Sequence, residues 1–367
     1  MTGQVAVFLP SLTSGGAEQF ALDLARSLLV RGLEIDLVAA SATGPLAHRL
    51  PEGVRLINLD RAGVMRAVPP LARYLAAERP AALLSIMDHA NVAAVLARAL
   101  ARTKTRLVIS VHTDMGRLAF GEGTIKSALV PLAMRLTYRW ADHVVCVSEA
   151  VRERVMRLTR VPADRLTVVG NPISIAALRK SAAAPASHPW FAAGAPPVVL
   201  FVGRLNRQKN VAFLLQAFAR AVQVRDLRLC LIGEGPEQAA LAALAEELGI
   251  ESRVAFLGYL AEPAPFIRQA AVLALPSKVE GSGRVLIEAL ALATPVIALS
   301  GSGGPEEILA HSHDGKLIEP EDVAAFAAAI LAAAGAPASP AGNEELFERF
   351  RPAIVAEHYA QLLGVAG

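Results

Sequence analysis

The sequence predicts an α/β protein made of two Rossmann-like domains, each with a doubly wound parallel sheet. Short apolar runs alternate with amphipathic segments along the chain, and this alternation lapses once and then restarts. The length of 367 residues also suits two domains, because one hydrophobic core rarely serves more than about 250–300 residues. We therefore expect the two domains to face each other across a cleft that holds the ligand.

The first domain is expected to span residues 1–180. Its strands are predicted from six apolar runs: 5–10, 34–39, 82–87, 106–111, 143–148 and 166–171. Between the first two lies an amphipathic segment that ends on Gly32, and glycine is favoured just beyond a helix C-terminus. Residues 181–197 carry four prolines and little periodicity, so they are expected to link the domains.

The second domain is expected to span residues 198–343. Its strands are predicted at 198–203, 227–233, 253–258, 271–276, 294–299 and 316–320, and its helices at 210–222, 236–249, 283–293 and 322–335. Residues 344–367 are expected to form helices that pack back toward the first domain.

Composition narrows the class of protein. The chain is 54% hydrophobic and 19% charged, which excludes a disordered or fibrous protein. Cys146 and Cys230 both lie in strand-like runs, so we expect buried free thiols and a reducing cytoplasm. No secretory signal is expected, and no apolar stretch reaches the roughly 18–20 residues needed to span a bilayer.

Charge is divided unevenly along the chain. The net charge is +3, but residues 1–185 contribute +9 and the remainder −6. A basic first half favours an anionic partner, such as a phospholipid surface, a phosphorylated acceptor or nucleic acid. Alternatively, these arginines lie on ordinary solvated helices.

The most informative run is EGSGRVLIEALA, which begins at Glu280. Gly281, Ser282 and Gly283 precede Arg284, Val285 and an apolar helical pattern that contains Glu288. Backbone N–H groups at a helix start can hold an anion, and the helix dipole favours negative charge there. A carboxylate on each side could accept hydrogen bonds from hydroxyl groups, so the run suits a nucleotide sugar. The alternative is a loop with two solvated glutamates.

Two cations follow the first strand of the second domain, in the run VGRLNRQKN. Arg204 and Lys209 come after Gly203 and before a helix, where both could neutralise a departing nucleoside diphosphate. They could equally be solvated surface cations. Gly233 belongs to a Gly-x-Gly turn after another strand, which we expect to lie beside the nucleotide.

In the first half, Gly15 and Gly16 lie between a strand and a helix, so a ligand could approach the backbone closely. A purely structural turn is the alternative. His112 follows the strand at 106–111. A lone histidine is more often a packed or surface residue, but its place in the expected cleft makes His112 a candidate catalytic residue, with Asp114 as a weaker candidate.

Metal chemistry is not expected. The run HSHDG at 311–315 resembles a metal site but has the composition of a turn, and no Asp-x-Asp motif is present to bind a divalent cation on a diphosphate. Residues 300–309 form another glycine-rich turn before a helix, which could contact a sugar or cap that helix.

Residues 115–140 mix apolar side chains with four basic ones. This pattern suits a helix that rests on anionic lipid, although it also fits an ordinary packed helix.

Taken together, these motifs resemble the GT-B glycosyltransferases of the large retaining family 4, also described as glycosyl transferases group 1. The resemblance covers essentially the whole chain. It rests on GGAE, SVHTD, VSEAVRE, NPI, VGRLNRQKN, IGEGPE, the run from Glu280 to Glu288, and SGGPEEIL. The ordered set is far more specific than any single motif. Ser282, where the family often has Phe, and Ala293–Thr294, where it commonly has Gly, are departures near the expected sugar pocket.

The resemblance implies a role for each candidate residue. Glu288 would hold the ribose hydroxyls and Glu280 the hexose hydroxyls, while Arg204 and Lys209 would bind the diphosphate. Gly16 would line the donor phosphates from the opposite side, and His112 would hydrogen-bond a sugar hydroxyl. Retention of configuration, independence of metal and a C-terminal helix that returns to the first domain are also implied.

We therefore expect a metal-independent enzyme that moves a hexose or N-acetylhexosamine from a UDP- or GDP-linked sugar to a saccharide or polyprenyl-linked acceptor. The resemblance favours bacterial surface glycan synthesis. We expect the enzyme to act in the cytoplasm or, as a peripheral protein, on the inner face of the membrane, with no nucleic acid as a partner. Two alternatives stay open: a nucleotide-sugar 2-epimerase and a non-catalytic nucleotide-sugar-binding protein. A nicotinamide-dependent dehydrogenase is disfavoured, because no Gly-x-Gly-x-x-Gly opens the first helix.

Overall fold

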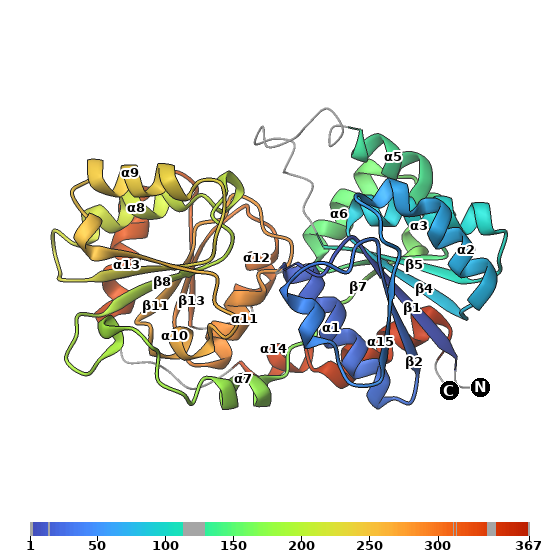
Figure 1. The fold of residues 1–367 in the computed structure, drawn as a ribbon. Helices are drawn as coiled ribbons and strands as arrows, with labels where there is room; N and C mark the ends of the chain where they lie inside the picture. The colour runs from blue at the N-terminus through green and yellow to red at the C-terminus, as the bar shows by residue number, and fades with distance from the viewer. Residues whose placement is uncertain are drawn as a thin grey trace. The chain divides into compact units, whose positions relative to one another are not determined.

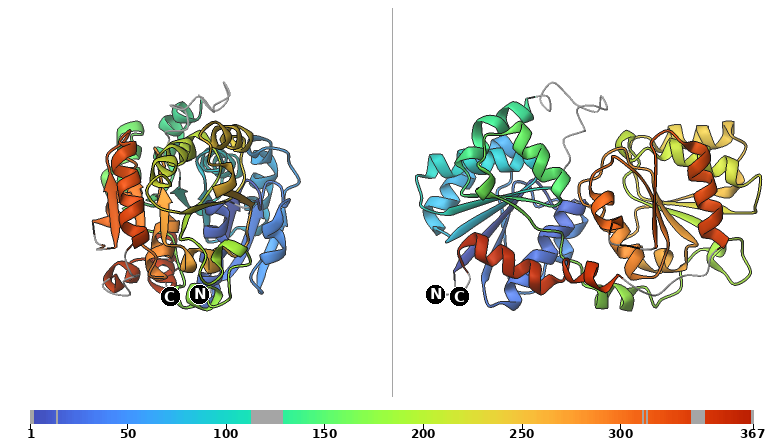
Figure 2. Two further views of the ribbon diagram at one scale, coloured as in Figure 1. Left: turned by 90° about the vertical axis from the view of Figure 1, so that its left-hand side faces the viewer. Right: turned by 180° about the vertical axis from the view of Figure 1, so that it is seen from behind.

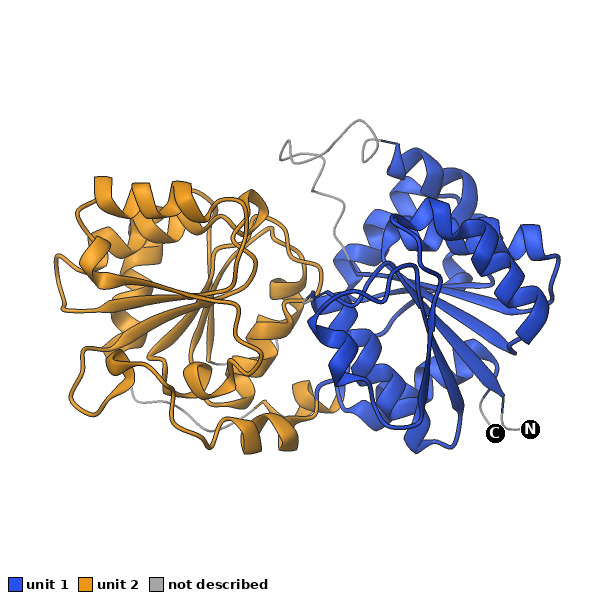
Figure 3. Cartoon of the chain, viewed as in Figure 1, with its two compact units in different colours: residues 1–118, 123–173, 349–367 blue, residues 119–122, 174–348 orange. Residues whose placement is uncertain are grey.

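The computed structural model describes residues 3–13, 15–112, 129–310, 312, 314–335 and 343–365. These residues form two compact units (Figure 3). Unit 1 holds the described residues of Met1–Leu118, Gly123–Ile173 and Arg349–Gly367, and unit 2 holds those of Ser174–Glu348. The chain therefore leaves unit 1, completes unit 2 and returns to unit 1 for its last residues.

Unit 1 is built on a seven-stranded parallel sheet of order β3-β2-β1-β4-β5-β6-β7 (Figure 1). Its strands are β1 Gln4–Leu9, β2 Glu34–Ala39, β3 Val54–Asn58, β4 Ala82–Ile86, β5 Arg106–Val111, β6 His143–Cys146 and β7 Leu166–Val168. Its helices are α1 Gly16–Val30, α2 Val68–Glu78, α3 Asp88–Ala101, α5 Val130–Thr137, α6 Glu149–Leu158 and α15 Pro352–Leu363.

The sheet of unit 1 is covered on both faces (Figures 1 and 2). One face packs against α2, α3 and α5, and the other against α1 and α15. The central strands are therefore buried almost throughout, which is why they read as continuous apolar runs in the sequence.

The last helix completes the core of unit 1. α15 packs against α1, β4 and β5, and its residues Val355, Tyr359 and Leu363 are buried. These positions recur every four residues, so they form one apolar face of the helix. The expectation of a C-terminal helix that returns to the first domain is confirmed.

Unit 2 is built on a six-stranded parallel sheet of order β10-β9-β8-β11-β12-β13. Its strands are β8 Val198–Val202, β9 Arg228–Ile232, β10 Val254–Gly258, β11 Val272–Leu275, β12 Val296–Leu299 and β13 Gly315–Ile318. Its helices are α7 Ile175–Ser181, α8 Val211–Ala221, α9 Gln238–Glu247, α10 Ala264–Gln269, α11 Arg284–Ala291, α12 Gly304–Leu309, α13 Val323–Gly335 and α14 Glu344–Glu348.

Both sheets reverse their strand order at one strand. β1 pairs with both β2 and β4, so Val7 lies between Leu37 and Leu84, and β8 likewise pairs with both β9 and β11. Ligands of doubly wound sheets bind outside the carboxyl ends of the strands at this switch point. The loops that follow β1 and β8 are therefore the first places to look for a site in each unit.

The interfacial helix expected at 115–140 is seen in part. Residues 113–128 lie outside the described residues, and α5 with the 3-10 turn Tyr138–Trp140 accounts for the rest. Within the part of the chain that the structure describes, no helix is long and apolar enough to cross a membrane.

Candidate functional site

In unit 2, the loop that follows β8 is held by backbone hydrogen bonds to the loop after β9. Gly203 N donates to Ile232 O at 2.9 Å, and Leu205 N donates to Glu234 O at 3.0 Å. A Cβ on Gly233 would lie 2.0 Å from Gly203 O, so only glycine allows these two loops to approach this closely. The predicted role of Gly233 beside the nucleotide is untested, but its packing role is clear.

Lys209 is positioned by a local cap. It ends a short 3-10 helix, Arg207–Lys209, whose N-cap residue is Asn206: the Asn206 side chain accepts a hydrogen bond from Lys209 N at 3.1 Å. Asn210 then takes a left-handed conformation and starts α8. The lysine side chain therefore extends from a backbone turn that hydrogen bonds hold in one conformation.

Lys209 and Glu280 lie together. The Lys209 Nζ donates to Glu280 Oε2, and Ser277 Oγ lies 3.4 Å from the same oxygen. The two charged side chains are only 18% and 14% exposed, so their mutual attraction is less screened than that of a surface pair. Two of the residues expected to bind the donor are thus brought together from positions 71 residues apart in the chain.

A neighbouring side chain, Gln208, joins the two loops a second time. Gln208 Nε2 donates to Val279 O at 2.9 Å, and Lys278 N donates to Gln208 O at 3.0 Å. The pair of bonds fixes the backbone on either side of the Lys209–Glu280 contact. Sequence reasoning missed Gln208, because a glutamine among charged loop residues carries no visible signal of such a clamp.

The Glu280 backbone is also tied to the loop before α12. Glu280 N donates to Ser302 O at 2.7 Å and Gly304 N donates to Glu280 O at 2.9 Å, forming an isolated parallel bridge with Gly303. Glu306 caps this loop by accepting from Ser302 N and Gly303 N. Of the two functions expected for residues 300–309, helix capping is therefore the one that the structure displays.

The predicted anion-binding segment forms the start of α11. Gly283 caps the helix at a positive φ of 57°, where glycine is favoured, and Gly281 and Gly283 are buried. Arg284 Nε donates to Glu288 Oε1 at 2.8 Å, one turn along the helix. Glu288 therefore already has a cationic partner, and a ligand hydroxyl would share this carboxylate with Arg284.

The remaining predicted residues of unit 2 lie close to these pairs in the sequence. Ser282 and Val285 are half-buried next to Gly283 and Arg284. Arg204 is exposed, and none of the ion pairs found among the described residues includes it. Its convergence with Lys209 on one diphosphate stays a prediction.

In unit 1, the glycine pair opens α1. Gly15 is the N-cap residue, and a Cβ on it would lie 2.1 Å from Glu18 Oε2. Glu18 is buried and accepts a hydrogen bond from Thr13 Oγ1 at 2.9 Å. By contrast, no described atom lies within 4 Å of a Cβ on Gly16, so the space beside Gly16 is open. Sequence reasoning singled out both glycines but gave no role to Glu18, the last residue of the GGAE motif.

His112 follows β5 directly, so it lies at the carboxyl end of a central strand. Its ring packs against Phe20 of α1 with centroids 4.3 Å apart, and its Nε2 lies 2.9 Å from Ser110 Oγ. Burial lowers the pKa of His112 to about 3, because the charged imidazolium would lose its hydration there. The ring is therefore neutral at physiological pH.

Some predicted features cannot be placed. Asp114 and two residues of the HSHDG run, His311 and His313, lie outside the described residues. Among the residues that are described, no group of three or more His, Cys, Asp or Glu side chains is arranged to hold a metal ion. Cys146 and Cys230 are buried and free, and burial raises the pKa of each thiol to about 12.

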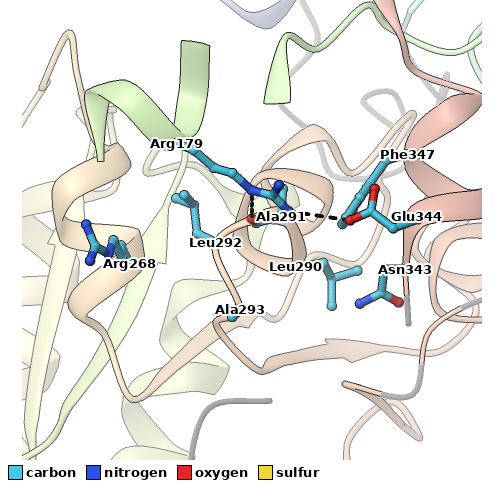
Figure 4. Close-up of a pocket in the computed structure, with 9 residues that line it drawn as sticks. All are labelled: Arg179, Arg268, Leu290, Ala291, Leu292, Ala293, Asn343, Glu344 and Phe347. Atoms are coloured by element: carbon cyan, nitrogen blue, oxygen red, sulfur yellow. Dashed lines mark hydrogen bonds and ion pairs between the residues drawn. The ribbon is translucent and has the colours of Figure 1, made fainter. Parts of the chain in front are cut away.

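A pocket in unit 2 is lined by none of the predicted donor residues (Figure 4). It has a volume of about 340 Å³ and is lined by Arg179, Arg268, Leu290, Ala291, Leu292, Ala293, Asn343, Glu344 and Phe347. Arg179 bridges it by donating to Ala291 O and pairing with Glu344. This pocket is at the C-terminal end of α11, whereas Gly283 caps the N-terminus of the helix and Glu288 lies in its middle.

Comparison with known proteins identifies the class. Residues 14–177 match the family model Glycosyltransferase Family 4, and residues 187–339 match Glycosyl transferases group 1. The chain is 28% identical over 364 residues to the lipopolysaccharide core biosynthesis glycosyltransferase LpsE of Rhizobium meliloti, which covers 95% of this chain and 96% of that protein.

Two further proteins are similar over most of their length. An N-acetylgalactosaminyltransferase of Campylobacter jejuni, named for a diphospho-undecaprenol-linked acceptor, is 26% identical over 332 residues, with 86% of each chain covered. The crystal structure of Anabaena Alr3699/HepE in complex with UDP-glucose superposes with a TM-score of 0.80 at 20% identity, covering 99% of this chain and 100% of that one.

The two parallel-sheet units and these matches define a two-domain transferase of the GT-B class. The chain belongs to the glycosyltransferases, with a family 4 domain followed by a group 1 domain.

Proposed function

We propose that this glycosyltransferase moves a hexose or N-acetylhexosamine from a UDP- or GDP-linked sugar to a saccharide or lipid-linked acceptor, with retention of configuration and without a metal ion. The observation that carries the proposal is the set of ion pairs Lys209–Glu280 and Arg284–Glu288 around the start of α11. Complexes and names of the similar proteins support the substrate classes: HepE binds UDP-glucose, and the Campylobacter enzyme is named for a polyprenyl-linked acceptor.

The proposed step is loss of a nucleoside diphosphate, so negative charge develops on the leaving oxygen. Lys209, with Arg204 nearby in sequence, would stabilise that charge together with the N–H groups at the start of α11. These fixed positive charges can perform the task that a divalent cation performs in other transferases. Glu280 and Glu288 would then accept hydrogen bonds from the sugar and ribose hydroxyls, as the family resemblance implies.

The ion pairs suit this role because they are already formed. A diphosphate that approaches Lys209 would compete with Glu280 for the ammonium group, and a sugar hydroxyl could then donate to the released carboxylate. Binding of the diphosphate and binding of the sugar would therefore be coupled through the Lys209–Glu280 pair. The clamp by Gln208 holds both loops in place while the partners exchange.

The enzyme is proposed to act in the cytoplasm, on the inner face of the membrane, in the synthesis of a bacterial surface glycan. The two buried free cysteines suit a reducing compartment. Four large apolar side chains gather on one stretch of unit 1: Leu129, Leu132, Leu136 and Trp140 are each 50–58% exposed. Their spacing of three or four residues places them on one face, opposite the buried Met134 and Tyr138.

Basic residues flank this apolar face. Arg135 and Arg139 are exposed within the same stretch, and the Arg139 guanidinium lies 5.1 Å from the centre of the Trp140 ring. Apolar side chains with arginines between them suit insertion into an anionic lipid surface. Binding there would bring unit 1 to a lipid-linked acceptor.

Donor identity is tested by thermal denaturation with a panel of UDP and GDP sugars, since a ligand of the folded state raises its melting temperature. A specific nucleotide sugar should stabilise the wild type and fail to stabilise Lys209→Ala. Product analysis of the same donor, with and without a saccharide acceptor, then separates transfer from hydrolysis or epimerisation. The proposal fails if no nucleotide sugar raises the melting temperature.

Membrane binding is tested by co-sedimentation with phosphatidylglycerol–phosphatidylcholine vesicles at low salt. Leu132→Glu combined with Leu136→Glu should abolish binding, while Leu100→Glu should not, because Leu100 is equally exposed but lies on α3. Binding that survives the double change, or none by the wild type, would contradict the membrane proposal without affecting the donor site.

A further inference from the structure

A chain of hydrogen bonds runs from the last helix of the protein to His112. The Tyr359 hydroxyl on α15 lies 3.1 Å from Ser110 Oγ on β5, and Ser110 Oγ lies 2.9 Å from His112 Nε2. Tyr359 is 249 residues from Ser110 in the sequence, so only the return of α15 to unit 1 creates this contact.

The three groups are held rigidly. Tyr359 and Ser110 are fully buried, and Phe20 packs against both rings, with centroids 4.3 Å from His112 and 5.7 Å from Tyr359. Burial lowers the pKa of His112 to about 3, so the imidazole is neutral and carries one proton. Which nitrogen holds that proton is set by the bond that the other nitrogen makes.

The donor and acceptor roles of Tyr359, Ser110 and His112 follow from the acceptors available to each proton. Among the described residues, Ser110 Oγ is the one hydrogen-bond partner of the Tyr359 hydroxyl. A buried phenol proton needs an acceptor, so Tyr359 donates to Ser110. The Ser110 proton must then point to its other partner, His112 Nε2. The reverse direction would leave the buried Tyr359 proton without any acceptor.

We propose that Tyr359 is a positioning residue which, through Ser110, fixes His112 as the tautomer protonated on Nδ1. Nε2 then serves as an acceptor within the protein, and Nδ1–H is the group with which His112 can bind a ligand. His112 is thereby a donor toward an oxygen atom and cannot act as a base at Nδ1. The identity of that oxygen, a hydroxyl of the donor sugar, rests on the proposed function, whereas the tautomer does not.

The tautomer can be read directly without substrate. Protein labelled with ¹⁵N-histidine is examined by two-bond ¹H–¹⁵N correlation spectra at pH 7, with the His112 signals identified by their loss in His112→Gln. The wild type should show a protonated Nδ1 and a bare Nε2. Tyr359→Phe and Ser110→Ala should each populate the Nε2-protonated form, because Nε2 loses its oriented donor.

The matched control is Tyr138→Phe. Tyr138 is a buried tyrosine of the same unit whose hydroxyl donates to Asp88 and accepts from Asn91, so its loss removes a similar group. Asn91 also donates to the Ser110 backbone oxygen, but it takes part in neither of the two side-chain hydrogen bonds that join Tyr359, Ser110 and His112. Its spectrum should match that of the wild type. The proposal is overturned if wild-type His112 is protonated on Nε2, or if Tyr359→Phe and Ser110→Ala both leave the tautomer unchanged.

Kinetics provide a second, separable readout. If transfer from a nucleotide sugar is observed, Tyr359→Phe should lower kcat several-fold with little change in the Kd of the nucleoside diphosphate, because His112 is expected to contact the sugar and not the diphosphate. Equal kcat for Tyr359→Phe and Tyr138→Phe would contradict the positioning role. A protein that transfers no sugar but shows the Nδ1–H tautomer would refute the proposed function alone.

Discussion

The two units share a sheet architecture but present different chemistry at the carboxyl ends of their strands. In unit 2 the loops after β8 and β11 carry charged side chains that are paired with each other, as Lys209 is with Glu280. In unit 1 the loop after β5 presents His112, which burial keeps neutral. The fold therefore determines where a ligand site can form, and the loop residues determine whether that site suits charged groups or uncharged hydroxyl groups.

The difference has a physical basis in the neighbours of each group. The Lys209 ammonium group is partly buried and donates a hydrogen bond to the Glu280 carboxylate, which provides a countercharge in place of water. Among the described residues, the ring of His112 lies instead against Phe20 and the hydroxyl of Ser110, neither of which offers a countercharge. The two side chains therefore lie in different electrostatic surroundings.

The largest expected effect comes from removing the cation of unit 2. Lys209→Ala should lower kcat/KM for transfer by at least about tenfold, because the leaving diphosphate loses its counter-charge. Steady-state kinetics on the folded variant measure this. Lys316→Ala removes an exposed lysine from β13 of the same unit and should leave kcat/KM unchanged. Equal kinetics of the two variants would remove Lys209 from the site.

A change at Glu288 tests the carboxylate that is proposed to bind the ribose of the donor. Glu288→Gln should raise the Kd of the nucleoside diphosphate at least about tenfold, since a neutral amide accepts hydroxyl hydrogen bonds less strongly than a carboxylate. Calorimetric titration measures this. Glu246→Gln, an exposed position on α9, serves as the control. Undiminished affinity in Glu288→Gln would show that the Arg284 pair is purely structural.

Substitution of one glycine in each unit compares the effects on the free energy of unfolding and on donor binding. Gly233→Ala should lower the free energy of unfolding by about 1–3 kcal/mol, because its φ is 130° and the added Cβ meets Gly203 O. Gly16→Ala should change stability by less than about 0.5 kcal/mol, since the space beside it is open. If Gly16 admits donor phosphates, the same change should weaken donor binding about fivefold.

Urea unfolding and donor titration of both glycine variants measure these effects. Wild-type donor affinity in Gly16→Ala would indicate that the open space beside α1 serves no ligand.

The smallest expected effect near neutral pH comes from unit 1, because the pH dependence due to His112 becomes appreciable only as pH falls below its unfolded pKa of about 6.5. His112 has its pKa lowered to about 3 in the folded state, so between the unfolded value near 6.5 and that pH the unfolded chain binds a proton that the folded chain does not. Stability should therefore fall as pH falls across this window, by at most about 1.4 kcal/mol per pH unit from this residue.

Denaturant unfolding at several pH values tests the His112 contribution. His112→Gln should reduce the slope, and His48→Gln, which removes an exposed histidine, should not. His143, whose pKa burial also lowers, is present in both variants and contributes equally. An unchanged slope in His112→Gln would mean that His112 binds its proton equally in the folded and unfolded states.

Most of the fold could be predicted from sequence because the central strands are buried on both faces. The runs expected at 34–39 and 106–111 coincide with β2 and β5. The strand β3 was missed, since it lies at the sheet edge and its side chains are half-buried or exposed. An edge strand alternates polar and apolar residues and loses the continuous apolar pattern.

The site was predicted less completely than the fold. Glu280 and Lys209 were found because charged residues beside glycines, between a strand and a helix, are a recognisable pattern. Gln208 and Tyr359 were not, because each acts through a partner 71 or 249 residues away and neither has a distinctive local context. Contacts of that range exist only in the folded chain.

The position of α15 at the end of the chain has a consequence for biosynthesis. At about 5–20 residues per second, the ribosome needs roughly 10–40 seconds to make unit 2 after the first stretch of unit 1 has emerged. During that interval the nascent protein exposes the apolar surface of unit 1 that Val355, Tyr359 and Leu363 will later cover. A premature stop codon before Pro352 should therefore yield a polypeptide that chaperones retain, even though every loop of unit 2 is intact.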